Sequence, residues 1–216
     1  MTGVLRHKSR LRTPWKNGGG TTAEVASAPE GASLSDFAWR VSIAEVTQDG
    51  PFSEFVGVDR IIVVIEGAGM VLGADGVEHR LEPMRPFDFS GDVATMARLI
   101  DGPTRDINVM TRRQLSTANV AVEFITSEKL LDVDVVKNEE LVVIATSGNL
   151  SIAERGAPLD GRKSIGCRES LTTPVRTSLT SLDALHQHGP SSFELSGDGV
   201  AVIVRLRNLL VPTSTL

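Results

Sequence analysis

The chain has 216 residues, a formal net charge of −5 and an apolar fraction of 41%. This length and composition allow one large or two small packed domains, and the mixed charge signs exclude a nucleic-acid surface of the usual basic kind. No apolar run approaches the roughly 20 residues that a membrane-spanning helix needs, so no membrane span is expected.

The N-terminal segment is basic, with no acidic residue before Glu24. Its bases recur at a spacing of about two residues, as Arg6, Lys8, Arg10, Arg12 and then Lys16. That spacing favours a charged edge strand, because charge on an edge discourages aggregation. A secretory signal is not expected, since the required apolar region is missing.

Strand signals dominate the rest of the chain. Segments rich in β-branched residues are separated by Gly, Pro and Asp turns. We expect strands over residues 21–27, 38–47, 60–65, 70–72, 93–100, 106–111, 120–125, 140–145 and 200–207. One short helix is expected over residues 181–188, with Ser181 as its N-cap and Gly189 as its stop. Many short strands with little helix predict an all-β sandwich or barrel.

One motif occurs twice. Phe87-Asp88-Phe89-Ser90-Gly91-Asp92 precedes Arg98-Leu99, and Phe193-Glu194-Leu195-Ser196-Gly197-Asp198 precedes Arg205-Leu206. An apolar run that turns at glycine lies upstream of each copy. The repeat predicts two β domains, residues 1–115 and 116–216, with each Ser-Gly-Asp in a turn. The order of strands and turns resembles the cupin fold. The resemblance implies a bicupin, that is, tandem cupin-like β-barrels or jelly rolls in one compact chain.

Metal ligation is not expected. Metal-binding cupins usually carry His-x-His in their first motif and another histidine in the second, but this chain has Ser53-Glu54-Phe55 and Asn108 near those places. His186 and His188 lie two residues apart on the predicted helix, so they would not face the same way. His7 and His79 are interpreted as exposed or hydrogen-bonded. No metal and no other cofactor is predicted.

The least generic segment is Trp15-Lys16-Asn17-Gly18-Gly19-Gly20, followed by Thr22 and Glu24. Consecutive glycines permit converging main-chain N–H groups, which form an anion-binding nest. Lys16 adds a positive charge and Trp15 a flat apolar wall. A flexible turn before the first strand is the alternative.

Two strands are expected to present polar side chains on one face. Arg40 and Ser42 alternate with apolar residues in the first strand, and Asn108 and Met110 share a face with Asp106 in the second. In a single sheet, such a polar face would be exposed to solvent. In packed barrels it could line a polar cavity, where Arg40, Glu24 and Asn108 would meet.

The loop over residues 50–60 combines an aromatic wall at Phe55 with the Ser53 hydroxyl and a predicted Asp59–Arg60 ion pair. The second half lacks such a set, since Glu194 and Asp198 are expected in turns. A single site would therefore lie in the first domain.

Four ordered blocks between residues 14 and 113 resemble the HutD/Ves family. They are Pro14 to Gly20 with Thr22 and Glu24; Trp39-Arg40 with Ser42 and Ala44; Gly50 to Ser53 with Phe55, Gly57, Asp59 and Arg60; and Asp106 with Asn108, Met110 and Arg113. The resemblance implies a bicupin without the usual metal ligands. It also implies a link to bacterial histidine utilisation, through sensing an intermediate such as formylglutamate or urocanate.

These observations predict a site for a small carboxylate metabolite. Its expected residues are Trp15, Lys16, Asn17, Gly19, Gly20, Thr22, Glu24, Arg40, Ser42, Ser53, Phe55, Arg60, Asn108 and Met110. A metal-independent sensor or regulatory protein is the leading hypothesis. The alternatives are a metal-free enzyme, either a hydrolase or an isomerase with Glu24 as general base, and a protein-binding module.

The cellular setting is predicted from the cysteine content. Cys167 is the only cysteine and cannot form an internal disulfide, which favours a reducing cytoplasm. Neither nucleic acid nor a membrane is expected as a partner. Assembly as a homodimer stays open.

Overall fold

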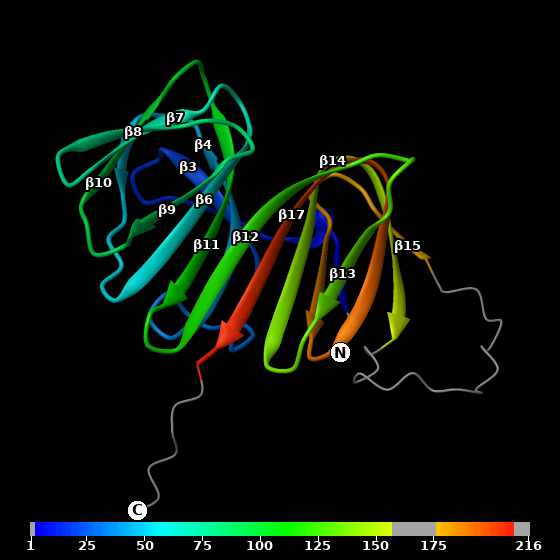
Figure 1. Ribbon diagram of the computed structural model, residues 1–216. Coiled ribbons are helices and arrows are strands. Elements are labelled where there is room, and N and C mark those ends of the chain that lie inside the picture. The colour runs from blue at the N-terminus through cyan, green and yellow to red at the C-terminus, as the bar shows by residue number, and fades with distance from the viewer. Residues whose placement is uncertain (1–2, 157–175, 210–216) are drawn as a thin grey trace, which may run out of the picture. The chain divides into compact units, whose positions relative to one another are not determined.

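The computed structural model describes residues 3–156 and 176–209, which form two compact units (Figure 1). We call residues 8–122 with 204–209 the N-terminal unit, and residues 3–7 with 123–156 and 176–203 the C-terminal unit. Strands make up most of both units, and the only helical turn among the described residues is the 3-10 turn η1 (His7–Ser9). The all-β prediction is therefore confirmed. The domain boundary at residues 115/116 and the tandem cupin interpretation stay predictions.

Two antiparallel sheets form the N-terminal unit. The larger sheet has the order β2 (Arg12–Pro14), β3 (Gly20–Ala28), β4 (Trp39–Val46), β11 (Thr104–Arg112), β6 (Val58–Glu66) and β9 (Pro86–Ser90). The smaller has the order β5 (Gly50–Phe52), β10 (Thr95–Leu99), β7 (Met70–Ala74) and β8 (Val77–Leu81). Period-two alternation along these strands gives each sheet an apolar face.

The apolar faces of the two sheets pack together. A buried cluster combines residues of β4 and β6 with residues of β7, β8 and β10, namely Val46, Ile62, Val64, Met70, Leu72, Leu81 and Ala97. A second, smaller cluster comprises Phe37, Val58 and Met110. Burial of each large apolar side chain contributes roughly 1.5–3 kcal/mol, so these clusters hold the inner face of the larger sheet in place.

A third sheet contains the strands of the C-terminal unit, together with residues 116–122 and 204–208, which are counted with the N-terminal unit. Its order is β1 (Gly3–Leu5), β16 (Ala184–His188), β14 (Glu139–Gly156), β17 (Ser191–Asn208) and β12 (Ser116–Ile125), while β13 (Leu131–Val135) pairs with β17 and β15 (Arg176–Leu179) with β14. Leu141, Val143, Leu185, Leu195 and Ile203 belong to its buried core.

The predicted helix over residues 181–188 is wrong, because residues 184–188 form strand β16. Thr180 to Asp183 form a turn, in which Asp183 N–H donates to the Thr180 carbonyl and the Asp183 carboxylate accepts from the Thr180 hydroxyl. Strand β16 then pairs with both β1 and β14. Turn-forming residues can precede a strand as well as a helix, and long-range pairing decided between them here.

The second copy of the repeated motif departs from the first. Gly91 follows strand β9, whereas Gly197 and Asp198 lie inside the long strand β17. Gly197 has φ +113°, and an added Cβ there would clash with the Asn149 carbonyl oxygen on β14. The prediction that Glu194 and Asp198 are turn residues is therefore wrong. Glu194 is buried in β17 and ion-paired with Arg155 and Arg176.

The N-terminal segment contains two short edge strands, but only Arg12 of its five spaced bases lies in one of them, so the predicted period-two charged edge strand is wrong. Strand β1 lies at an edge of the C-terminal sheet, and β2 lies at an edge of the larger N-terminal sheet. The turn η1 separates them. Within the described residues, no helix is long and apolar enough to cross a membrane.

Candidate functional site

Strand register gathers most of the predicted polar side chains on the inner face of the larger N-terminal sheet. Across β3, β4, β11 and β6, one row places Glu24, Ser42, Asn108 and Ile62 in register. The next row, which extends to β9, places Ser27, Arg40, Met110, Arg60 and Phe89 in register. A third row, across β4, β11 and β6, places Ala44, Asp106 and Val64 in register. We call Glu24, Arg40, Ser42, Arg60, Asp106 and Asn108 the polar cluster.

Arg60 is the most deeply buried cation of the polar cluster, with 5% of its surface exposed. Its guanidinium lies 5.5 Å from the Phe52 ring centre, 5.7 Å from that of Phe55 and 4.8 Å from that of Phe89. These cation–π contacts offset part of the cost of burying the charge.

The hydrogen bonds of Arg60 are few and long. Nε donates to Asn108 Oδ1 at 3.5 Å, and Nη1 donates to the Ser53 carbonyl at 3.4 Å. Among the described residues, no carboxylate lies within ion-pairing distance of this guanidinium. Burial, and then the charge of Arg40, lower its pKa to about 10, while Asp106 acts in the opposite direction. Arg60 is therefore a buried cation with hydrogen-bonding capacity to spare.

Asp106 lies on the same strand face as Asn108 and is only 2% exposed. Its Oδ2 atom has no hydrogen-bond partner among the described residues. Burial raises the pKa of Asp106 to about 7, although the nearby positive charge of Arg60 opposes the change. This carboxyl is therefore available as a hydrogen-bond donor when it is protonated. It was not predicted as a site residue, but its period-two spacing from Asn108 could have identified it.

Arg40 and Glu24 meet as predicted, in an ion pair. Arg40 Nε donates to Glu24 Oε2 at 2.8 Å and its Nη1 donates to Ser42 Oγ at 3.3 Å. Glu24 Oε1 accepts from Ser27 Oγ at 2.9 Å. The Glu24 side chain is 35% exposed, against 13% for Arg40. The polar cluster is thus open near Glu24 and closed near Arg60.

Apolar side chains border the polar cluster on two sides. Met110 and Phe55 belong to the Phe37 cluster, while Phe52 and Phe89 pack on the cluster between the two sheets. Phe55, which was predicted as an aromatic wall, lies on this apolar border together with Met110. The interior of this unit is therefore partly hydrocarbon, with a polar band along the larger sheet.

The predicted Asp59–Arg60 pair is wrong, because neighbouring residues of a strand point to opposite faces. Asp59 instead accepts from Arg113, at 2.7 Å from its Nη2. Ser53 is exposed, and it accepts a hydrogen bond from Arg60 through its backbone carbonyl and not through its hydroxyl.

The glycine-rich segment forms a closed turn. Gly18 N–H donates to the Trp15 carbonyl and Gly19 N–H to Asn17 Oδ1, so neither amide converges on a vacant anion position. Lys16 is exposed. An added Cβ at Gly20 would clash with the Glu45 carbonyl oxygen, which explains why this position needs glycine.

Trp15 fixes this turn to the first long strand. Its indole Nε1 donates to Thr22 Oγ1 at 2.7 Å, and its ring contacts Phe52 edge-on at 5.9 Å between ring centres. The arrangement favours the alternative interpretation of the glycines, a structural turn, and places Trp15 and Thr22 beside the polar cluster as support.

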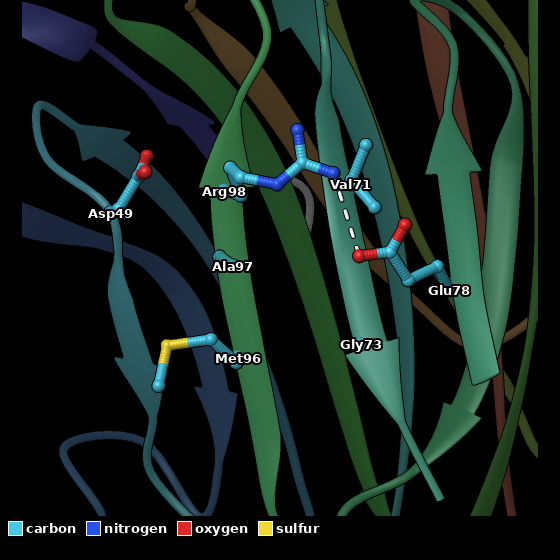
Figure 2. A pocket seen from close by; sticks show the side chains of 7 residues that line it. All are labelled: Asp49, Val71, Gly73, Glu78, Met96, Ala97 and Arg98. Carbon is cyan, nitrogen blue, oxygen red and sulfur yellow. Dashed lines mark hydrogen bonds and ion pairs between the residues drawn. The ribbon is translucent and has the colours of Figure 1, made fainter. Parts of the chain in front are cut away.

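A depression on the smaller sheet is unrelated to the polar cluster. Figure 2 shows its lining side chains, which come from β10, β7, β8 and the loop before β5: Asp49, Val71, Gly73, Glu78, Met96, Ala97 and Arg98. Its one ion pair, Arg98 to Glu78 at 3.4 Å, is well exposed at both partners. Exposed pairs of this kind contribute little, and no predicted ligand-binding residue lines the depression.

The chain is similar in sequence and in structure to several known proteins. The family model described as HutD matches residues 7–203. An uncharacterized 21.2 kDa protein in the hutC 3' region of Pseudomonas putida is 44% identical over 110 residues, and protein Ves of Citrobacter koseri is 41% identical over 110 residues. Each match covers 50% of this chain and only 56% of the relative's length. The structure of HutD from Pseudomonas fluorescens SBW25, determined in a formate condition, is 29% identical with a TM-score of 0.76, covering 97% of this chain and 100% of that one.

Proposed function

Since the chain belongs to the HutD family, we propose that it is a metal-independent binding protein for a small carboxylate metabolite. The ligand would occupy the polar cluster of the N-terminal unit. In this proposal the protein acts as a sensor or regulatory component in the cytoplasm.

The observation that carries the proposal is the buried Arg60 guanidinium, which has two long hydrogen bonds and no ion-paired carboxylate among the described residues. A buried cation is costly unless an anion pairs with it. A ligand carboxylate would supply that anion, and each charge-assisted hydrogen bond contributes roughly 1.5–3 kcal/mol.

The charges of the polar cluster also suit an anionic ligand. The polar cluster contains two guanidinium groups, Arg40 and Arg60, and two carboxyl groups, Glu24 and Asp106. While Asp106 holds its proton, the four groups carry a net charge of +1. Asn108 and Ser42 add neutral hydrogen-bonding groups suited to an amide or formyl oxygen.

The names of the relatives suggest which carboxylates to test. One relative is described by its place beside hutC and another is HutD itself. We therefore propose a link to histidine catabolism, with an N-formylglutamate-like or urocanate-like ligand.

A sensor is favoured over an enzyme because Glu24, the expected general base, is already engaged. One of its oxygens accepts from Arg40 and the other from Ser27. A general base must reach the proton that it removes, and these bonds direct the two Glu24 oxygens toward Arg40 and Ser27 instead.

Thermal unfolding of the chain with urocanate and with N-formylglutamate tests the proposal. Binding to the native state alone raises the melting temperature by mass action. The matched controls are methyl urocanate and the dimethyl ester of N-formylglutamate, which lack the anionic charge. We expect stabilisation by at least one acid, none by its ester, and no turnover when the stabilising acid is followed by chromatography. Stabilisation by neither acid would contradict the proposed ligands.

A further inference from the structure

Strands β14 and β16 bring a carboxylate and two imidazoles to one face of the C-terminal sheet. Glu140 is the register partner of His188, and His186 is two residues away on the same strand. Alternate residues of a strand share a face, so His186 and His188 point the same way. Leu141 and Leu185, whose side chains belong to the core, point to the opposite face. The strand that replaced the predicted helix is what makes this arrangement possible.

The three side chains are close enough to share one ion. Glu140 Oε2 lies 3.0 Å from His186 Nε2 and 2.8 Å from His188 Nδ1. One potential donor atom from each residue lies within 4.8 Å of the other two. The two imidazole rings are tilted against each other with centres 4.2 Å apart. The Glu140 and His186 side chains are 10% and 14% exposed, whereas the His188 side chain is 52% exposed.

We propose that Glu140, His186 and His188 form a binding site for a divalent transition-metal ion such as Zn²⁺. Zinc takes imidazole nitrogen and carboxylate oxygen at about 2.0–2.2 Å, which places neighbouring donors roughly 3–3.5 Å apart. The two separations between Glu140 and the imidazoles need only a small opening to reach that spacing. Two imidazoles favour Zn²⁺, Ni²⁺ or Cu²⁺, because Mg²⁺ and Ca²⁺ prefer all-oxygen sites.

Three protein ligands leave at least one coordination position for water or a small anion. The exposure of His188 gives the ion a route to solvent. These residues belong to the C-terminal unit, and the polar cluster belongs to the N-terminal unit. The proposed metal site and the proposed carboxylate site can therefore be tested independently of each other.

Hydrogen bonding alone is the competing explanation, in which Glu140 simply accepts from both imidazoles. The two explanations differ in where the protons lie. A metal needs both ligating nitrogens deprotonated, so binding releases protons and weakens as the pH falls. A hydrogen-bonded trio takes up no metal at any pH.

Calorimetric titration of the tag-free, full-length chain with Zn²⁺ tests the site, with Co²⁺ absorption as a second readout of the ligand field. We expect one ion per chain and a lower affinity at lower pH. Replacing a ligand, by His188→Ala or by Glu140→Gln, should weaken binding by at least about tenfold, the lower end of the loss seen even for outer-shell partners. His188 is half-exposed, so its replacement should leave the fold intact, which circular dichroism checks.

Two control variants separate this site from other metal ligands. His79→Ala removes an imidazole from β8 in the other unit, and Cys167→Ser removes the only thiol. Both should bind Zn²⁺ as the wild type does. No saturable binding by the wild-type chain, or an unchanged affinity in His188→Ala and Glu140→Gln, would overturn the proposal. Loss of binding in Cys167→Ser would show that the thiol binds the ion, and it would also overturn the proposal.

Discussion

Asp106 is the most informative single position, because its carboxyl is buried among the residues of the polar cluster with one oxygen unpartnered. We expect Asp106→Asn to change how stability depends on pH. Burial raises the pKa of Asp106 to about 7 from an ordinary 3.8. The folded chain therefore keeps a proton between these pH values that the unfolded chain has released.

The sign of the effect follows from proton linkage. Stability falls with rising pH wherever the folded state binds more protons than the unfolded state. The contribution of Asp106 therefore becomes unfavourable from about pH 4 to about pH 7 and is constant above that. One pKa unit corresponds to about 1.4 kcal/mol, so between pH 5 and pH 8 the wild type should lose about 3 kcal/mol relative to Asp106→Asn.

Urea unfolding of both proteins at pH 5 and pH 8 measures this difference. Asparagine leaves a buried amide in place of the carboxyl, so its absolute stability can shift by a constant amount. The change in this stability difference between the two pH values is therefore the informative quantity. Asp75→Asn, on the exposed β7–β8 turn, controls for loss of a surface carboxylate. A difference between wild type and Asp106→Asn that stays the same at both pH values would refute a raised Asp106 pKa.

Two further substitutions probe the site and its support. Arg40→Ala leaves Glu24 without its ion-pair partner beside the ligand, so calorimetry should show an acidic ligand bound about tenfold or more weakly in a chain that still folds; unchanged affinity would remove Arg40 from the site. Gly20→Ala places a Cβ against the Glu45 carbonyl and should destabilise the chain by roughly 1–3 kcal/mol in urea unfolding. Gly19→Ala is its control, because a Cβ there meets only the Asn17 side chain, at 3.4 Å. Equal stability of the two alanine variants would contradict the steric explanation.

Period-two alternation carried much of the prediction of this site. It placed Arg40 with Ser42, and Asn108 with Met110, before any strand pairing was known. The same rule would have separated Asp59 from Arg60, since adjacent strand residues face opposite ways. That pair was predicted from opposite charge alone, and Asp59 instead forms an ion pair with Arg113.

The depth at which Arg60 lies could not be predicted from the sequence. It depends on β9 pairing with β6, which brings Phe89 into register with Arg60. It also depends on strand β5 and the loop that follows it, which add the Phe52 and Phe55 rings. Pairings between distant segments are set by packing and are not encoded in a local pattern.

The histidines also show that a local sequence pattern does not determine strand pairing. A cap-like Ser181 and a stop-like Gly189 predicted a helix, on which His186 and His188 would diverge. Pairing with β1 and β14 made the segment a strand and turned both imidazoles toward Glu140. A single error in local structure therefore concealed a candidate metal site.

If Arg60 binds a ligand carboxylate, the Arg60→Met variant should lose most of its affinity for the ligand. Methionine fills much of the same space among Phe52, Phe55 and Phe89 without a charge, and replacing buried ions by apolar residues is often neutral or stabilising. The measurement is calorimetric titration of both proteins with the acid that stabilises the wild type most. We predict a folded variant whose affinity for that acid is reduced by a factor of ten or more. A folded variant that binds the acid as tightly as the wild type would show that Arg60 does not bind the ligand carboxylate.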